Sequence, residues 1–184
     1  MNKMWNYIKD WFTEMGSPPL FFKWSSKILP WLILVTFVVF TLGLTWGLFY
    51  SPTDYKQGDV YRIIYIHVPS AILGQSIFLF MAVCGFITMV WRVKISGMLL
   101  KSAAPIGASF TLLALLTGSI WGKPTWGTWW VWDARLTSML VLAIFYLLFI
   151  ITNKLIQQED KANKISSIIA IFGFINIPII KYSV

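Results

Sequence analysis

Five long runs of apolar residues alternate with short polar segments along the chain. The runs cover residues 28–50, 63–90, 103–120, 134–152 and 165–180. A transmembrane helix needs about 20 predominantly apolar residues to cross the hydrocarbon core of a bilayer. The first four runs approach or exceed this length, and the last is short for a span. The pattern predicts an all-α protein, a polytopic transmembrane helix bundle with about five spans.

The chain before the first run follows a different pattern. Apolar residues recur there at helical spacing with charged residues between them, as is typical of an amphipathic helix at the membrane interface. The apolar positions are Met1, Met4, Trp5, Ile8, Trp11, Phe12 and Met15. The segment from Gly16 to Pro19 then favours a break. The chain therefore divides into an interfacial N-terminal segment, residues 1–27, and a single transmembrane domain, residues 28–184.

The composition also indicates a membrane protein. Of the 184 residues, 58% are hydrophobic and 12% are charged, and a soluble domain of this composition would lack the polar residues to cover its surface. The net charge is +8, but the basic residues are scattered through short loops, which argues against nucleic-acid binding. The single cysteine, Cys84, excludes a disulfide or a cysteine metal site within the chain.

The basic residues predict how the chain is oriented. If successive runs cross the membrane, ten lysines and arginines lie on the side of the N-terminus and five on the other side. The positive-inside rule then places the N-terminus in the cytoplasm and the connections 51–62 and 121–133 on the outer face. Small residues four apart, Ser70 with Gly74 and Ala103 with Gly107, are expected to let the second and third spans approach closely.

His67, the only histidine of the chain, lies at the outer end of the second apolar run. An ionisable group at this depth is a candidate functional residue. Imidazole can bind iron, zinc or copper, or it can relay protons. The alternative is a structural histidine that forms hydrogen bonds to a neighbouring helix or to lipid headgroups.

Tryptophan is concentrated in the connection between the third and fourth runs. Five of the eleven tryptophans fall there within twelve residues, at Trp121, Trp126, Trp129, Trp130 and Trp132. The aromatic belt of a membrane protein explains one or two such rings at a helix end. Five rings, with Gly122 and Gly127 to let the backbone bend, predict a surface that holds a flat, apolar ligand.

Charged residues flank this connection. Asp133 precedes the fourth run, where a carboxylate is expected to cap the helix and interact with its dipole. Arg62, Lys123 and Arg135 are among the few cations on the outer side, and they are candidates to receive an anionic group of a ligand. Lipid headgroups and the nearby aspartates are their alternative partners.

A haem matches all three features, because it combines a flat apolar macrocycle, an iron that accepts imidazole and two propionates. No Walker loop, dinucleotide fingerprint, nucleophile elbow or paired metal-ligand motif in the sequence points to other chemistry.

The segment Trp126–Asp133 reads WGTWWVWD and resembles the WGxxWxWD signature of the haem-handling membrane proteins of cytochrome c biogenesis. Residues 134–138 and 66–71 resemble one branch in particular, the haem exporter protein C (CcmC) family. The similarity runs from about Phe21 to the C-terminus, and a motif of eight positions with four aromatic residues is highly specific.

The resemblance implies a protein that presents haem b, as transient cargo, at the outer, periplasmic face of a bacterial or mitochondrial inner membrane. It implies delivery of this haem to the haem chaperone CcmE, with the ABC transporter subunits CcmA and CcmB and the small membrane subunit CcmD as companions. By position, His67 matches the first external axial histidine, and Trp126–Asp133 match the haem-contacting loop. Such a protein is better described as a carrier than an enzyme, although the family is sometimes called haem lyase.

The C-terminus departs from the family pattern, which has six spans and a second external histidine in the loop after the fifth. This sequence stops at Val184, where that loop should begin. Two expectations follow: a truncated chain, or a haem iron with a single protein ligand. We favour truncation, because the fifth span otherwise lacks its hairpin partner.

Two other functions remain open at this point. One is a channel or transporter for haem or another amphiphile, although the first, third and fifth runs contain no charged residue and no inverted repeat is evident. The other is a structural subunit that docks a periplasmic partner through its Trp-rich connection.

Overall fold

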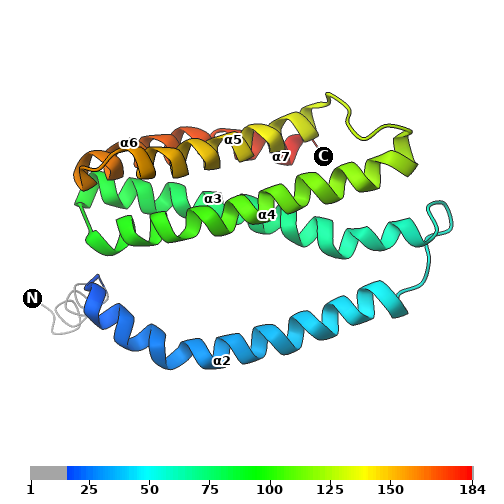
Figure 1. The fold of residues 1–184 in the computed structure, drawn as a ribbon, viewed down its shortest axis with the longest axis horizontal. Helices are drawn as coiled ribbons and strands as arrows, with labels where there is room; N and C mark the ends of the chain where they lie inside the picture. Colours follow the sequence, from blue (N-terminus) through cyan, green and yellow to red (C-terminus); the bar gives the residue numbers. More distant parts are fainter. Residues whose placement is uncertain (1–15, 184) are drawn as a thin grey trace, which may run out of the picture.

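The protein, as a computed structural model, is described over residues 16–183, where its regular elements are all helices (Figure 1). They are α2 (Pro18–Thr45), the π-helical turn η1 (Trp46–Tyr50), the 3-10 turn η2 (Asp59–Ile63), α3 (Ile64–Trp91), α4 (Lys94–Trp126), α5 (Ala134–Leu155), α6 (Glu159–Phe174) and α7 (Asn176–Tyr182). Five stretches are long and apolar enough to cross a membrane, which confirms the predicted class. The predicted interfacial helix falls on residues 1–15, outside the described part.

Several helices are longer than the apolar runs that predicted them. Helix α4 begins at Lys94 and ends at Trp126, and it contains Pro105 and Pro124. Proline is tolerated inside transmembrane helices because neighbouring groups satisfy the freed carbonyls. The Trp-rich connection is therefore helical as far as Trp126, and only residues 127–133 form a loop. Likewise, Pro18 opens α2, since its fixed φ suits the first helical turn.

The short fifth run is part of a longer helical segment. Helices α6 and α7 follow each other almost without interruption from Glu159 to Tyr182, and together they make a stretch of 24 residues. The polar first turns of α6 supply the length that the apolar run alone lacks. This segment is therefore long enough for a span.

Helices α3 to α7 pack around one core. Its largest fully buried apolar side chains are Phe78, Met81, Leu100, Leu142, Tyr146 and Phe149. Small residues allow the close approach: a Cβ on Gly74 of α3 would lie 2.6 Å from Thr111 Oγ1 of α4. Gly107 was expected at the same contact, but it faces Tyr146 of α5 instead. The Tyr146 hydroxyl donates to the Gly74 carbonyl at 2.7 Å, which links three helices.

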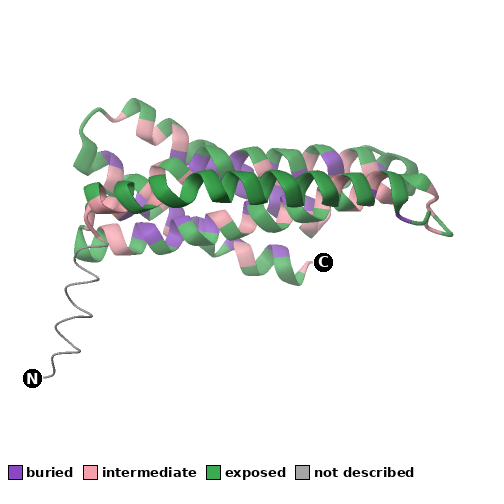
Figure 2. Ribbon diagram, turned by 90° about the horizontal axis from the view of Figure 1, so that it is seen from below, coloured by how far each residue is buried: buried purple, intermediate pink, exposed green. Residues whose placement is uncertain are grey.

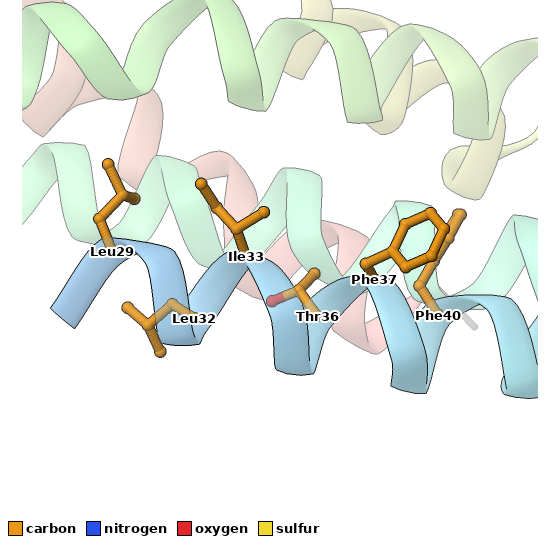
Figure 3. Close-up of a pocket in the computed structure, with 6 residues that line it drawn as sticks. All are labelled: Leu29, Leu32, Ile33, Thr36, Phe37 and Phe40. Carbon is orange, nitrogen blue, oxygen red and sulfur yellow. The ribbon is translucent and has the colours of Figure 1, made fainter.

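Helix α2 stands apart from this bundle (Figure 1). None of its residues is buried, and Figure 2 shows it exposed along most of its length in front of the helices that hold the core. A cavity of about 450 Å³ on it is lined only by its own side chains, Leu29, Leu32, Ile33, Thr36, Phe37 and Phe40 (Figure 3). The apolar surface of α2 suits contact with lipid chains.

The two ends of the bundle carry different connections. The segment from η1 to η2 and the Trp-rich loop lie at one end (right in Figure 1). The α3–α4 and α5–α6 turns lie at the other end. A hydrogen bond of 2.7 Å from Trp121 Nε1 to Gln57 Oε1 joins the two connections at the first end. This contact confirms that both connections lie at the same end of the bundle.

Candidate functional site

Trp121, near the end of α4, contacts residues of three other segments at the candidate site. Its indole N–H donates to Gln57 in the loop before η2. Its ring meets Tyr61 of η2 edge-on at 6.3 Å between centroids and His67 of α3 edge-on at 5.7 Å. Edge-to-face pairs at these distances stabilise a fixed arrangement of the rings. The predicted site residues Trp121 and His67 are thus brought together.

The imidazole of His67 is held through one nitrogen. Its Nδ1 lies 3.0 Å from the carbonyl oxygen of Ala114 and 3.1 Å from Thr117 Oγ1, both on α4. A carbonyl can only accept, so Nδ1 carries the proton and donates it. The lone pair of a neutral ring is then on Nε2. Nε2 has no hydrogen-bond partner among the described residues, and it is not one of their fully buried unpartnered atoms.

The His67 ring also packs tightly against Gly118 of α4. A Cβ added to Gly118 would lie 3.0 Å from Cε1 of the His67 ring, closer than side chains usually pack. The Thr117 hydroxyl donates to the Leu113 carbonyl at 2.7 Å, so its oxygen is oriented as an acceptor toward His67. Fixing one imidazole nitrogen in this way sets the direction of the other.

The Trp-rich loop begins where α4 ends. Gly127 has φ +77°, a left-handed conformation that favours glycine, and its N–H donates to the Lys123 carbonyl at 3.0 Å. Beyond it, Trp129 and Trp132 are 56% and 77% exposed. Trp130 meets Trp132 edge-on at 5.5 Å. The loop therefore presents several indole rings outward, in contrast to a buried aromatic core.

Two of the predicted cations lie over these rings. Lys123 Nζ is 5.9 Å from the Trp129 ring centre and donates to the Gly127 carbonyl at 3.0 Å. The Arg135 guanidinium lies 5.2 Å from the Trp126 ring centre. Cation–π contacts of this kind hold each charge over the face of a ring. Lys123 and Arg135 thus flank the exposed rings from both ends of the loop.

Asp133 and Arg62 have structural partners. Asp133 caps α5, because its carboxylate accepts from the Leu136 N–H at 2.7 Å, and it pairs with Arg135 at 3.3 Å. The predicted capping role is confirmed. Arg62 donates to the carbonyls of Leu48 and Ser51 at 3.0 Å each and pairs with Asp59 at 3.4 Å, so most of its donors are used within the chain.

Two buried donors at this end of the molecule have no partner among the described residues: Trp130 Nε1 and Arg62 Nε. A buried N–H without an acceptor costs free energy, and both atoms would be satisfied by carboxylate oxygens. The residues present therefore suit the chemistry of haem: an imidazole nitrogen for iron, indole rings for the macrocycle, and donors and cations for two propionates.

Five contributors to the site were not predicted from the sequence: Gln57, Tyr61, Ala114, Thr117 and Gly118. Gln57 lies in a loop whose fold depends on tertiary contacts, so its sequence carried no signal. Thr117, Gly118 and Trp121 recur at spacings of three and four residues, which places them on one face of α4. The spacing shows that these residues share a face of α4, but it does not show which helix packs against that face.

Comparison with known proteins shows the family of the chain. The sequence profile of the family described as haem exporter protein C, CcmC, matches residues 11–184. Haem exporter protein C of Escherichia coli K12 is 46% identical over 171 residues, which are 93% of this chain and 70% of that protein. The chain belongs to the haem exporter protein C family. The Haemophilus influenzae member is 38% identical over 95% of this chain and 71% of its own length, and the Bradyrhizobium diazoefficiens member 41% over 93% and 65%.

Membership of the haem exporter protein C family agrees with the multi-pass helical architecture and with the resemblance of the segment Trp126–Asp133 to the family's signature. The part of the chain that matches the family includes all the described helices. His67, the Trp-rich loop and its flanking cations therefore lie within the region of similarity.

Proposed function

We propose that the protein binds haem at the outer, periplasmic face of the inner membrane and delivers it to the haem chaperone CcmE during maturation of c-type cytochromes. One observation carries the proposal. The proton on His67 Nδ1 is fixed by the Ala114 carbonyl, which leaves Nε2 as the nitrogen available to iron. Histidines that bind metals are typically oriented by such a hydrogen bond from the other ring nitrogen.

The remaining parts of the site support the same function. The exposed rings of Trp129 and Trp132 would form a platform for the macrocycle. The Trp121 ring contacts the His67 imidazole edge-on. Lys123, Arg135 and the unpartnered Trp130 N–H would receive the propionates. Haem supplies an iron centre that imidazole binds reversibly, which is what a carrier of transient cargo requires.

The proposal includes partners. A loop with side chains as exposed as Trp132, at 77%, provides a surface on which CcmE can dock while haem remains within reach. CcmA, CcmB and CcmD complete the assembly that membership of the family leads us to propose. Exposed apolar and aromatic groups that are not covered within the chain commonly mark such interfaces.

Haem delivery is tested with the full chain purified in mild detergent after haem supply. We expect a Soret band, and we expect haem to appear on separately purified CcmE after mixing. Absence of a Soret band after haem supply would contradict haem binding. A Soret band without transfer would leave binding intact and contradict delivery.

The role of the loop is tested by Trp129→Ala, with Trp31→Ala as the matched control. Both rings are exposed, at 56% and 69%, but Trp31 lies on α2 away from the site. We expect the loop variant to lose most haem transfer and the control to retain it. Loss of transfer while haem stays bound would assign Trp129 to docking of the chaperone. Equal behaviour of the two variants would show that the loop is a passive aromatic belt.

A further inference from the structure

A second cavity lies at the end of the bundle opposite the Trp-rich loop. Its volume is about 550 Å³, and it lies where the α3–α4 turn meets the first turns of α6 (left in Figure 1). The residues that line it include Met89, Arg92, Lys94, Asp160, Asn163 and Lys164. This cavity is separate from the haem site, because it is built from the other ends of α3 and α4.

The cavity is strongly positive. Arg92, Lys94 and Lys164 face it with a single carboxylate, Asp160. The neighbouring Glu159 does not add to the negative charge, because it pairs with Lys101 at 3.2 Å. Among residues 16–183, none of the three cations of the cavity takes part in an ion pair. Three cations converging on one cavity without anionic partners suit a phosphate group.

The wall of the cavity is fixed by local hydrogen bonds. Thr88 and Ser96 hydroxyls lie 2.8 Å apart across the turn, and Ser96 donates to the Val93 carbonyl at 2.7 Å. Arg92 has a left-handed backbone with φ 54°, and its N–H donates to the Thr88 carbonyl at 3.1 Å. Because the turn is braced in this way, the backbone of Arg92 is held at the rim of the cavity before any ligand binds.

The cavity also contains an unsatisfied polar atom. Asn163 Oδ1 is buried and has no hydrogen-bond partner within the described residues. A buried amide oxygen without a donor costs free energy, and a ligand hydroxyl would supply the donor. The site therefore offers cations for a phosphate and an acceptor for a hydroxyl beside it.

An apolar surface continues from the cavity toward the membrane. Met89 lines the cavity and is 40% exposed, and Val90 and Trp91 beside it are 53% and 63% exposed. Tryptophan at the end of a span favours the headgroup region of the bilayer. A ligand with a charged headgroup and acyl chains would contact both surfaces, whereas a soluble phosphate compound would leave the apolar one uncovered.

We propose that this cavity binds the phosphate headgroup of an anionic phospholipid, with phosphatidylglycerol as the best match. Its phosphate would contact Arg92, Lys94 and Lys164, its glycerol hydroxyls would donate to Asn163, and its chains would lie along Met89 and Trp91. Basic pockets between transmembrane helices recognise anionic lipids by this chemistry. Such a lipid binds where α3, α4 and α6 meet and would stabilise their packing.

The test is native mass spectrometry of the full chain in detergent, titrated with phosphatidylglycerol or with phosphatidylcholine of the same chains. We expect phosphatidylglycerol to bind roughly twentyfold more tightly to the unmodified protein, because each cation near a headgroup contributes about fivefold in affinity and the three cations with Asp160 leave a net charge of +2. The combined variant Arg92→Gly, Lys94→Gln and Lys164→Gln should lose this preference. Glycine at position 92 keeps the left-handed turn, and all three side chains are exposed, so the fold should persist.

The control variant is Lys27→Gln with Lys154→Gln. Both lysines are exposed, neither lines the cavity, and their loss lowers the positive charge of the same end of the molecule. We expect the control to keep the preference for phosphatidylglycerol. Loss of the preference in the control to the same degree would overturn the proposal, because general surface charge would then explain binding.

Two further arms identify the ligand. Asn163→Leu removes the amide without changing charge, and we expect it to weaken phosphatidylglycerol binding severalfold while leaving phosphatidylcholine unaffected. Glycerol phosphate tests a soluble source. If it binds the unmodified protein and the lipids show no preference, the cavity is a site for a soluble phosphate compound and the lipid assignment is wrong. Equal binding of both lipids with no phosphate binding overturns the site altogether.

Discussion

The orientation of the His67 ring depends on two acceptors of α4, the Ala114 carbonyl and the Thr117 hydroxyl. A carbonyl in a helix cannot be removed by substitution, but the hydroxyl can. Thr117 is 8% exposed. Among the described residues, its hydroxyl forms hydrogen bonds only to His67 and to carbonyls of α4. Its influence on haem therefore passes through the imidazole, which makes Thr117 a positioning residue.

Thr117→Val should weaken haem binding by about tenfold, the low end of the range for loss of an outer partner of a metal-binding histidine. Valine keeps the shape of threonine but cannot accept a hydrogen bond from Nδ1. The measurement is a haem titration followed by the Soret absorbance. Thr117→Ser is the matched control and should bind haem normally. Equal weakening by both substitutions would indicate a packing effect and not a hydrogen bond.

Asp133 provides a second separation of roles at the residue scale. Its carboxylate caps α5 through the Leu136 N–H, and an N-cap contributes about 1 kcal/mol to stability. Asp133→Ala should lower the free energy of unfolding in detergent by about this amount, whereas Asp133→Asn should preserve it, because an amide oxygen also caps. If Asp133→Asn instead lost haem binding with unchanged stability, the carboxylate would have a role at the ligand that the cap does not explain.

At the scale of elements, the α3–α4 hairpin decides which residues meet. Its turn consists of Arg92 and Val93. His67 and Gly118, which lie in contact, are equally far from this turn along the chain, one before it and one after it. Gly74 and Thr111 are related in the same way, closer to the turn. Antiparallel helices joined by so short a turn pair residues at equal distances from it, so the turn sets the register of the whole hairpin.

The sequence predicted both helices of this hairpin but not its register. The polar segment 91–102 contains three cations and is typical of a loop between spans, although most of it forms the first turns of α4. The spacing of apolar residues indicates which residues share a face of α4. It does not indicate where α4 begins, because no side chain caps its first turn. An error of a few residues in the turn would have paired His67 with a different part of α4, so the partners Ala114 and Thr117 could not be predicted.

Gly107 tests the packing between α4 and α5. A Cβ at this position would overlap the buried ring and hydroxyl of Tyr146. Gly107→Ala should therefore lower the free energy of unfolding by about 1–3 kcal/mol, the usual cost of an overpacked core. Gly43→Ala on α2 is the matched control, because nothing lies within 4 Å of its Cβ, and it should be neutral or slightly stabilising. Equal stability of the two variants in a denaturant titration would contradict the described contact.

At the scale of the whole molecule, the number of spans and the common end of the two functional connections were predictable from hydrophobic runs. The separation of α2 from the bundle was not, because an apolar helix has the same sequence pattern whether lipid or protein surrounds it. The joint between them depends on particular contacts: Arg62 donates to two carbonyls after α2, and Gly47 lies against the Tyr65 ring. Arg62 was predicted as a cation for the ligand, and its observed bonds give it a role in this joint.

The sequence identified candidate residues for the site but not how they are arranged. The residues His67, Lys123, Arg135 and the tryptophans were identified from type and spacing, and their role in binding haem stays a prediction. The link between them, Trp121 with its bond to Gln57, arises only when η2, α3 and α4 come together. The residue types of the site can be read from the sequence, whereas the contacts between these residues depend on the fold.

We propose that His67 holds the haem iron through Nε2. The most direct test is the visible spectrum of the His67→Gly variant after haem supply, with and without added imidazole. We expect the variant to lose most of the Soret absorbance of bound haem, imidazole to restore it by filling the vacated position, and thermal unfolding to be little changed. A His67→Gly protein whose spectrum equals that of the unmodified chain in the absence of imidazole would contradict the claim.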